Sequence, residues 1–277
     1  MRASPAFIII GAVTDSMNTT SATPPSSEQL CSSASDYWAG SCTHSRSVLF
    51  AGPFGADLVA GVVLGLVTVA LTVLLEALSW RTALTMARKD PQLYNHAWRM
   101  NILNNLCLGP IIFAASAWVF ARPQLPPTQL VFSCLGVLAV HAVGYYLVHK
   151  AFHEVPGMYC HHKLHHKFNT FVPPSAANCV SVVEYVLAYM APFPFGAIFF
   201  SPDRLAVLAA TSVVSFCNLL IHTPPLAEIS ARWLPWWAVA TSDHLEHHRR
   251  LTCLYAAPTI SLDRLLGAER GTKRGPD

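Results

Sequence analysis

The chain has 277 residues, of which 53% are hydrophobic and 12% charged, and its mean hydropathy is +0.39. Soluble domains carry about 25% charged residues, so this composition argues against a soluble globular protein and for long apolar segments. The formal charge of +3 gives no indication of a nucleic-acid partner.

Residues 1–48 are rich in Ser, Thr and Pro without apolar periodicity, which predicts a poorly ordered tail. The apolar stretch Ala6–Val13 is a candidate signal-peptide core, although it is short for that role. If this end is lumenal, Asn18-Thr19-Thr20 is a glycosylation sequon and Cys31 and Cys42 are expected to pair. Residues 49–277 are expected to form one membrane domain.

Five apolar runs follow, each near the ~20 residues that cross a bilayer as a helix. They predict an all-α integral membrane protein with four to five transmembrane or re-entrant helices. Gly109-Pro110 is expected to kink or break the second run, and Ser201-Pro202-Asp203 to join the last two as a helical hairpin. The runs are Leu58–Leu78, Ile102–Ala121, Gln129–Val148, Val180–Phe200 and Leu205–Ile221.

The distribution of basic residues predicts the orientation in the membrane. If the histidine-rich stretch is cytosolic, then residues 79–101, 149–175 and 222–277 share that side and hold 14 of the 18 Lys and Arg residues. This asymmetry agrees with the excess of basic residues in cytoplasmic loops. The histidine-rich cap and the C-terminus are therefore expected in the cytosol.

Histidine is unusually frequent, with 13 residues, and six of them fall between residues 149 and 166. Residues four apart on a helix share a face, so His149 and His153 are expected to point the same way. In each HxxHH motif the two adjacent histidines differ by about 100° in direction and can reach different metals. Pro156-Gly157 is expected to let the second motif fold back over the first. The clustered histidines are His149, His153, His162, His165, His166, His244, His247 and His248.

Eight clustered imidazoles are too many for one metal, since zinc usually takes four ligands, so the count predicts two metals. Imidazole suits iron, zinc and copper, and spacing alone leaves the metal open among them. Neither the HExxH pattern of zinc proteases nor the Glu-x-x-His pairs of bundle di-iron proteins is present. The sequence also has no CxxC, and Cys160 and Cys253 are not spaced as a thiolate set.

Other polar residues are assigned supporting roles. His141, inside the third run, is expected to bond a backbone carbonyl, and His161 to neighbour the ligands without joining them. Glu184 either orients a ligand imidazole or lies at the membrane interface. Asp243 and Glu246 are candidates for the same orienting role. Asp263 and Arg264 are expected to form a stabilising pair, and His44 and His96 to have no role in the site. The aromatics expected at the membrane interface or along a substrate channel are Tyr145, Tyr146, Trp233, Trp236 and Trp237.

The stretch from about Tyr145 to Gly267 resembles the fatty acid hydroxylase/sterol desaturase superfamily. The resemblance rests on several motifs taken together and on their order. These are YYLVHKAFH at 145–153, Val155-Pro156, Tyr159, HKLHH at 162–166, His222, HLEHH at 244–248 and LDRLLG at 262–267.

The resemblance implies two iron ions held by these histidines, with His222 as a ninth ligand, and dioxygen activation on the cytosolic side of the endoplasmic reticulum membrane. It makes residues 49–277 the catalytic domain. It also implies that electrons come in trans from a b-type cytochrome and its NAD(P)H-dependent reductase. Because zinc accepts the same imidazoles, zinc is a possible surrogate for iron in a structure.

The expected reaction is hydroxylation of a C–H bond in a membrane lipid of the sterol, fatty-acyl or sphingoid class. Desaturation of a sterol or other lipid is the nearest alternative. A membrane metal transporter or metal-binding protein is the rival from another class, and a zinc hydrolase is a further one.

Overall fold

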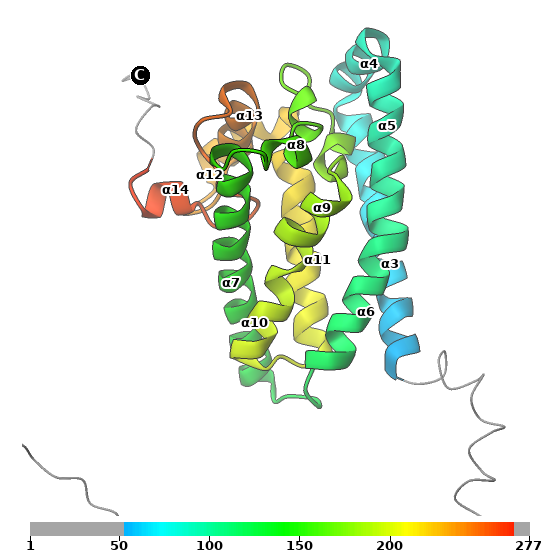
Figure 1. Cartoon of the computed structure of the whole chain (residues 1–277), viewed down its shortest axis with the longest axis vertical. Helices are drawn as coiled ribbons and strands as arrows, with labels where there is room; N and C mark the ends of the chain where they lie inside the picture. Colours follow the sequence, from blue (N-terminus) through cyan, green and yellow to red (C-terminus); the bar gives the residue numbers. More distant parts are fainter. Residues whose placement is uncertain (1–52, 269–277) are drawn as a thin grey trace, which may run out of the picture. The chain divides into compact units, whose positions relative to one another are not determined.

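A computed structural model describes residues 53–268, and these form helices joined by short loops (Figure 1). Within this part of the chain there is no β-strand, only two isolated bridges, which confirms the all-α prediction. The expectations for the tail at 1–48, for Ala6–Val13, for the Asn18 sequon, for the Cys31–Cys42 pair and for His44 lie outside the described residues.

Five helical stretches are long and apolar enough to cross a membrane, so the chain is a multi-pass membrane protein. The third extends further than predicted, to Glu154, and therefore carries His149 and His153 on one continuous helix. The stretches are α3 (Pro53–Leu78); α5 (Pro91–Ile102) continued by η1 (Leu103–Leu108) and α6 (Gly109–Phe120); α7 (Pro127–Glu154); α9 (Val182–Glu184) continued by η4 (Tyr185–Met190) and α10 (Pro192–Phe200); and α11 (Arg204–Ile221).

The second stretch is not broken at Gly109-Pro110, contrary to one of the two outcomes expected. Instead the chain makes a π-helical turn, η1, just before Pro110, in which the Gly109 N–H bonds the Asn104 carbonyl five residues back. Proline has no N–H to donate, so a local change of hydrogen-bond pattern is the usual response. The same occurs at η4, where the Ala191 N–H bonds the Val186 carbonyl ahead of Pro192.

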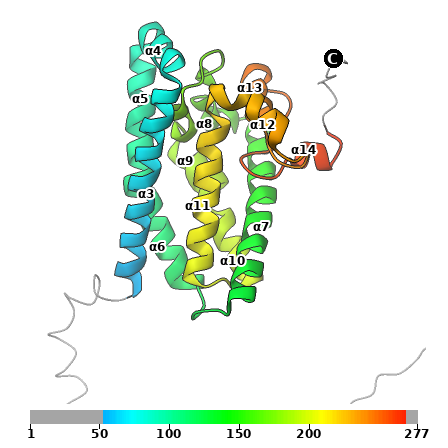
Figure 2. The ribbon, with the colours of Figure 1, turned by 180° about the vertical axis from the view of Figure 1, so that it is seen from behind.

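The spans run along one axis and the remaining short helices gather at one end (Figures 1 and 2). Helices α10 and α11 follow each other as predicted, but both pack mainly against α7 rather than each other. The elements at the gathered end are α4 (Trp80–Lys89), α8 (Tyr159–His162), η2 (His165–Lys167), η3 (Pro174–Asn178), η5 (Pro224–Leu226), α12 (Ala227–Trp233), α13 (Thr241–Arg250) and α14 (Leu262–Leu265).

Asp203 ties the opposite end of the bundle together. One carboxylate oxygen caps α11 by accepting from the Ala206 N–H at 2.8 Å, and the other accepts from the Leu125 N–H at 3.0 Å. The neighbouring Arg204 donates from Nε to buried Asp57 on α3 at 3.0 Å. These contacts fix how α3, α7 and α11 start relative to one another.

Helix α3 approaches the second span closely because it presents glycines to it. A Cβ on Gly65 would lie 2.0 Å from the Asn105 carbonyl oxygen, and one on Gly61 would lie 2.8 Å from the Pro110 Cα. Small residues one helical turn apart allow backbones to meet in this way. Further along α3, buried Glu76 accepts from the Ser175 N–H and the Tyr94 hydroxyl, both at 3.0 Å, and so holds the loop around η3.

Substitution of Gly65 by alanine is expected to destabilise the bundle by about 1–3 kcal/mol, the usual cost of overpacking, because a backbone oxygen cannot rotate away from the new methyl. Thermal unfolding in detergent or nanodiscs measures this. The matched control is Ala70→Val on the exposed side of α3, which adds more volume where it meets lipid. Equal stability of the two variants would contradict the close packing.

Tyr145 and Tyr146 do not lie in an interfacial belt. They are 1% and 5% exposed and belong to the core beneath the histidines, together with Phe152. Of the five aromatics in that prediction, the exposed ones are the tryptophans at and after α12, with Trp233 at 76% exposure and Trp236 at 64%. The interfacial interpretation therefore fits the tryptophans and is wrong for the two tyrosines.

Candidate metal centre

Four segments bring the predicted histidines together at one end of the bundle. They are the end of α7, the α8–η2 segment, the end of α11 and helix α13. The chain turns back after α7 at Gly157, whose φ of +85° is a conformation that glycine adopts readily. This turn lays the second motif against the first, as the Pro156-Gly157 break predicts.

The histidines form two groups. In each group the available ligand nitrogens all lie within 4.8 Å of one another. The first group is His149, His153, His162, His166 and His247, and the second is His165, His222, His244 and His248.

The first group joins three segments of the chain. The Nε2 atom of His162 lies 2.9 Å from that of His149 and 2.8 Å from that of His166. His166 Nε2 is 3.1 Å from His153 Nε2, and His247 Nε2 is 3.2 Å from His149 Nε2. All five are buried except His153, which is partly exposed.

The second group is fully buried and lies alongside the first. Its centre is His222, whose Nε2 is 2.9 Å from His244 Nε2 and 3.4 Å from both His165 Nε2 and His248 Nε2. His222 ends α11 as its C-cap, so the last apolar span delivers this imidazole directly into the cap.

Adjacent histidines separate into different groups, as their angular spacing predicts. His165 lies in the second group and His166 in the first, while His247 lies in the first and His248 in the second. Consecutive residues on a helix differ by about 100°, so each HxxHH motif contributes to both groups. The two groups are thereby built from the same short segments and stay side by side.

In the rings of His149 and His247, Nδ1 points away from the cluster and Nε2 points into it. The hydrogen bonds made by Nδ1 indicate that Nε2 carries a lone pair. His149 Nδ1 donates to the Tyr255 carbonyl, and His247 Nδ1 to the Cys253 carbonyl, both at 2.7 Å. A carbonyl oxygen only accepts, so in these neutral rings Nε2 has no proton. Yet the two Nε2 atoms face each other at 3.2 Å.

His222 has the same arrangement, with Nδ1 donating to the Asn218 carbonyl at 2.7 Å. Converging lone pairs without a proton between them repel, and a cation relieves this repulsion. Ligand nitrogens about 2.0–2.1 Å from one metal lie roughly 3–4 Å apart, which matches these separations. The residues therefore fit two metal ions, and all nine donors are imidazoles.

Burial keeps these imidazoles neutral. It lowers the pKa of His247 to about 3 and that of His222 to about 4. Burial, followed by neighbouring imidazoles, also lowers the pKa of His162, His165, His166, His244 and His248. A neutral imidazole is the form that binds a metal, so the nitrogens are ready to coordinate near neutral pH.

Glu184 takes the first of its two expected roles. It is buried at 1% exposure, and its Oε1 lies 2.7 Å from His162 Nδ1, within hydrogen-bonding distance. Ser181 places it by accepting the Glu184 N–H at the start of α9. A carboxylate behind a ligand histidine fixes the ring orientation and makes it a stronger ligand. Its other oxygen, Oε2, has no hydrogen-bond partner among residues 53–268.

Asp243 and Glu246 pair with arginines rather than with imidazoles of the cluster. Asp243 contacts Arg264, and Glu246 contacts Arg249 and Arg250 on its own helix. Asp263 accepts from the Ala256 N–H at 2.6 Å and so holds the segment that carries the Tyr255 carbonyl. Asp263 and Arg264 both make stabilising contacts, but these contacts are with Ala256 and Asp243, respectively.

The other histidines between residues 53 and 268 belong to neither group. His141 Nε2 is 3.1 Å from the Tyr189 carbonyl, as expected for a structural histidine. His161 and His96 are partly exposed and belong to neither group, and no cysteine joins a group in the described part of the chain.

Residue patterns alone did not identify several supporting groups. The carbonyls of Asn218, Cys253 and Tyr255 hold three imidazoles, but any residue type provides a carbonyl. Buried Asn104 donates to the carbonyls of Asn178 and Val180 at 3.0 and 3.3 Å and fixes the loop before α9. The sequence did contain a clue to the roles of Asn104 and Asn218, because a carboxamide within an apolar run is unusual and needs a hydrogen-bond partner.

Comparison with known families agrees with this site. Residues 134–268 match the family model described as Fatty acid hydroxylase, and that range contains all nine histidines. The chain has no significant match among curated proteins or among solved structures.

Proposed function

We propose that the chain, whose residues 134–268 match the family model described as Fatty acid hydroxylase, is a membrane di-iron oxygenase that hydroxylates a C–H bond of a lipid. Residues 49–277 form its catalytic domain. The substrate is a membrane lipid of the sterol, fatty-acyl or sphingoid class. The basic residues of the loops support an orientation with the histidine cap and the C-terminus in the cytosol. The endoplasmic reticulum membrane is the location that the family resemblance implies.

One observation carries this proposal. The nine imidazoles divide into two adjacent groups, each compact enough for one ion, and neither contains a cysteine or a carboxylate among the described residues. Imidazole ligands suit iron, and open coordination positions on iron are typical of oxygenases. The bound irons would activate dioxygen for abstraction of hydrogen from an unreactive C–H bond.

The chain's own residues hold and insulate this chemistry. Backbone carbonyls and Glu184 fix the orientation of the imidazole rings. The buried tyrosines lie between the histidines and the bilayer and exclude water from that side of the site. One oxygen atom of O2 enters the C–H bond and the other leaves as water, which consumes two electrons and two protons. A b-type cytochrome and its NAD(P)H-dependent reductase supply these electrons in trans.

Desaturation is the nearest alternative, because a second hydrogen abstraction on the same centre gives a double bond. A metal transporter is a weaker candidate, because both groups lie together at one end of the bundle rather than along a path through it. A zinc hydrolase needs a carboxylate as base, but buried Glu184 contacts His162 instead.

The test is expression in a lipid-producing host, with bound iron and the lipid profile measured for the wild type and the double variant His165→Ala/His247→Ala. This variant removes one imidazole from each group. A new oxygenated lipid with the wild type and none with the variant is expected. Identical lipid profiles, with two irons in the wild type, would count against the oxygenase. Failure of the purified wild type to retain any transition metal would overturn the site.

A further inference from the structure

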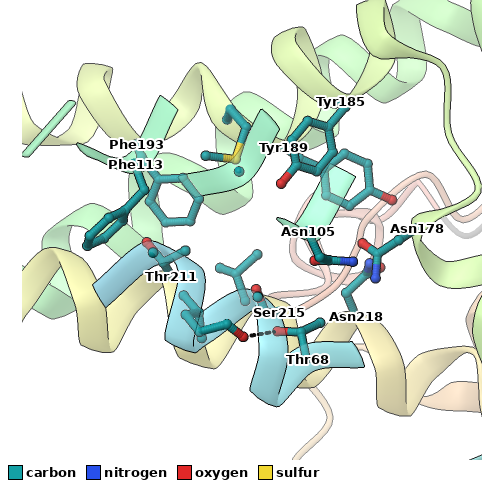
Figure 3. A pocket seen from close by; sticks show the side chains of 16 residues that line it. Thr68, Asn105, Phe113, Asn178, Tyr185, Tyr189, Phe193, Thr211, Ser215 and Asn218 are labelled. Atoms are coloured by element: carbon teal, nitrogen blue, oxygen red, sulfur yellow. Dashed lines mark hydrogen bonds between the residues drawn. The ribbon is translucent and has the colours of Figure 1, made fainter. Parts of the chain in front are cut away.

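A cavity of about 40 Å³ lies inside the bundle, between α3, α6, α10 and α11 and the two π-helical turns. Figure 3 shows that its side chains are sorted by polarity. Phe113 and Phe193 lie together at one side, while Asn105, Asn178 and Asn218 gather at the other. The volume suits roughly three water-sized groups, such as a small polar group and the carbons next to it.

On the polar side of the cavity, the side chain of Asn178 is free to bond a ligand, whereas Asn218 and Asn105 already donate to backbone carbonyls. Asn178 is 6% exposed, and its side chain makes no hydrogen bond to any residue from 53 to 268. Asn218 donates from Nδ2 to the Ala177 carbonyl at 3.1 Å, and Asn105 donates to the Asn101 carbonyl at 2.9 Å. A carboxamide has both donors and acceptors, so Asn178 is able to give and accept hydrogen bonds in the cavity.

The cavity lies directly behind the metal centre. The Asn218 carbonyl accepts from His222 Nδ1 of the second group at 2.7 Å. On the other side, the Tyr189 hydroxyl is 3.4 Å from that of Tyr145, whose ring centroid is 5.2 Å from that of His149 in the first group. The lining residue Asn218 therefore contacts the second group directly, and the lining residue Tyr189 reaches the first group through Tyr145.

No charged side chain lines the cavity. Its polar atoms are carboxamides, hydroxyls and phenols, including the Tyr185 hydroxyl. That phenol fits against Gly109, where a Cβ would lie only 2.7 Å from its oxygen. Burying a carboxylate or phosphate here without a cation would be costly, whereas a neutral alcohol loses little if its hydrogen bonds are replaced.

We propose that this cavity binds the hydroxyl group of a neutral lipid alcohol, with Asn178 as the residue that selects it. The attached carbons occupy the apolar side, against Phe113 and Phe193. The proposal rests on the proposed function and narrows its substrate, favouring an alcohol-bearing lipid such as a sterol over a free fatty acid.

Binding to the purified, metal-loaded protein in nanodiscs tests this directly. The probes are radiolabelled hexadecanol, hexadecanoate and hexadecane, which share a chain length and differ at one end. The variant Asn178→Leu replaces the carboxamide with an apolar group of similar size and removes no side-chain hydrogen bond within the described chain. The control is Asn95→Leu on the exposed side of α5.

The wild type and Asn95→Leu are expected to bind hexadecanol up to about tenfold more tightly than the other two probes, as one buried hydrogen bond allows. Asn178→Leu should lose this preference while keeping its metal content. Equal binding of hexadecanol and hexadecane by the wild type, or an unchanged preference in Asn178→Leu, would overturn the proposal.

The two proposals fail separately. If the wild type oxygenates a lipid in cells but shows no preference for the alcohol, the cavity assignment falls and the oxygenase stands. If the Asn178-dependent preference is present but no lipid is oxygenated, the cavity assignment stands as a binding site and the oxygenase falls.

Discussion

Replacement of His247 by alanine is expected to remove one of the two proposed metal ions and almost all of the proposed oxygenase activity. His247 is buried and its Nε2 lies 3.2 Å from that of His149, so its loss opens the first group and leaves the second intact. Loss of a ligand should exceed the roughly 10- to 100-fold cost of losing an outer contact to a ligand. His248→Ala should have the same effect on the second group.

Metal analysis of the purified variants, together with the oxygenated lipid they form in cells, measures both effects. The matched control is His161→Ala, next to His162 in sequence but outside both groups. It should keep two metals and normal activity. The two-group arrangement would be wrong if His247→Ala kept both metals, or if His161→Ala lost one.

Substitution of Glu184 by leucine is expected to weaken metal binding in the first group by about 10- to 100-fold. The carboxylate lies 2.7 Å from His162 Nδ1. Leucine leaves that nitrogen buried without a partner and frees the ring to turn or to change tautomer. Glu184→Gln keeps a carbonyl acceptor and should be affected less.

Titration of the apoprotein with metal against a competing chelator gives the two affinities. Glu154→Gln is the control, because Glu154 is exposed, belongs to neither histidine group and forms an ion pair with Lys150 at 3.9 Å. The affinity of the second group should stay at the wild-type value in every variant. If Glu184→Leu left the metal affinity of the first group unchanged, the carboxylate would not be needed to position His162.

Local patterns predicted most of the fold and the histidines. Five apolar runs gave five spans, because burying a helix in lipid needs about 20 apolar residues in sequence. The HxxHH spacing anticipated that His165 and His166 separate into different groups, since the angle between neighbours on a helix is fixed. Boundaries were less accurate, and α7 runs six residues past the predicted end at Val148.

Residues whose roles depend on distant partners were less predictable. Tyr145 and Tyr146 read as interfacial aromatics, yet packing against neighbouring spans buries them. Asp243 and Glu246 lie beside the third motif in sequence, but they contact arginines. Position next to a motif does not say which way a carboxylate points.

The sequence by itself determined the kind of protein, a count of four to five spans and eight clustered imidazoles, because these follow from composition and from periods within single helices. The ninth imidazole, His222, followed only from the family resemblance. Only the tertiary structure decided how the imidazoles divide into two groups, which carbonyls hold their outer nitrogens, and that Glu184 contacts His162. It also placed Asn178 and Asn218 in one cavity behind those groups. These relations join segments up to about 100 residues apart, such as His149 with Tyr255, so they depend on how the spans pack.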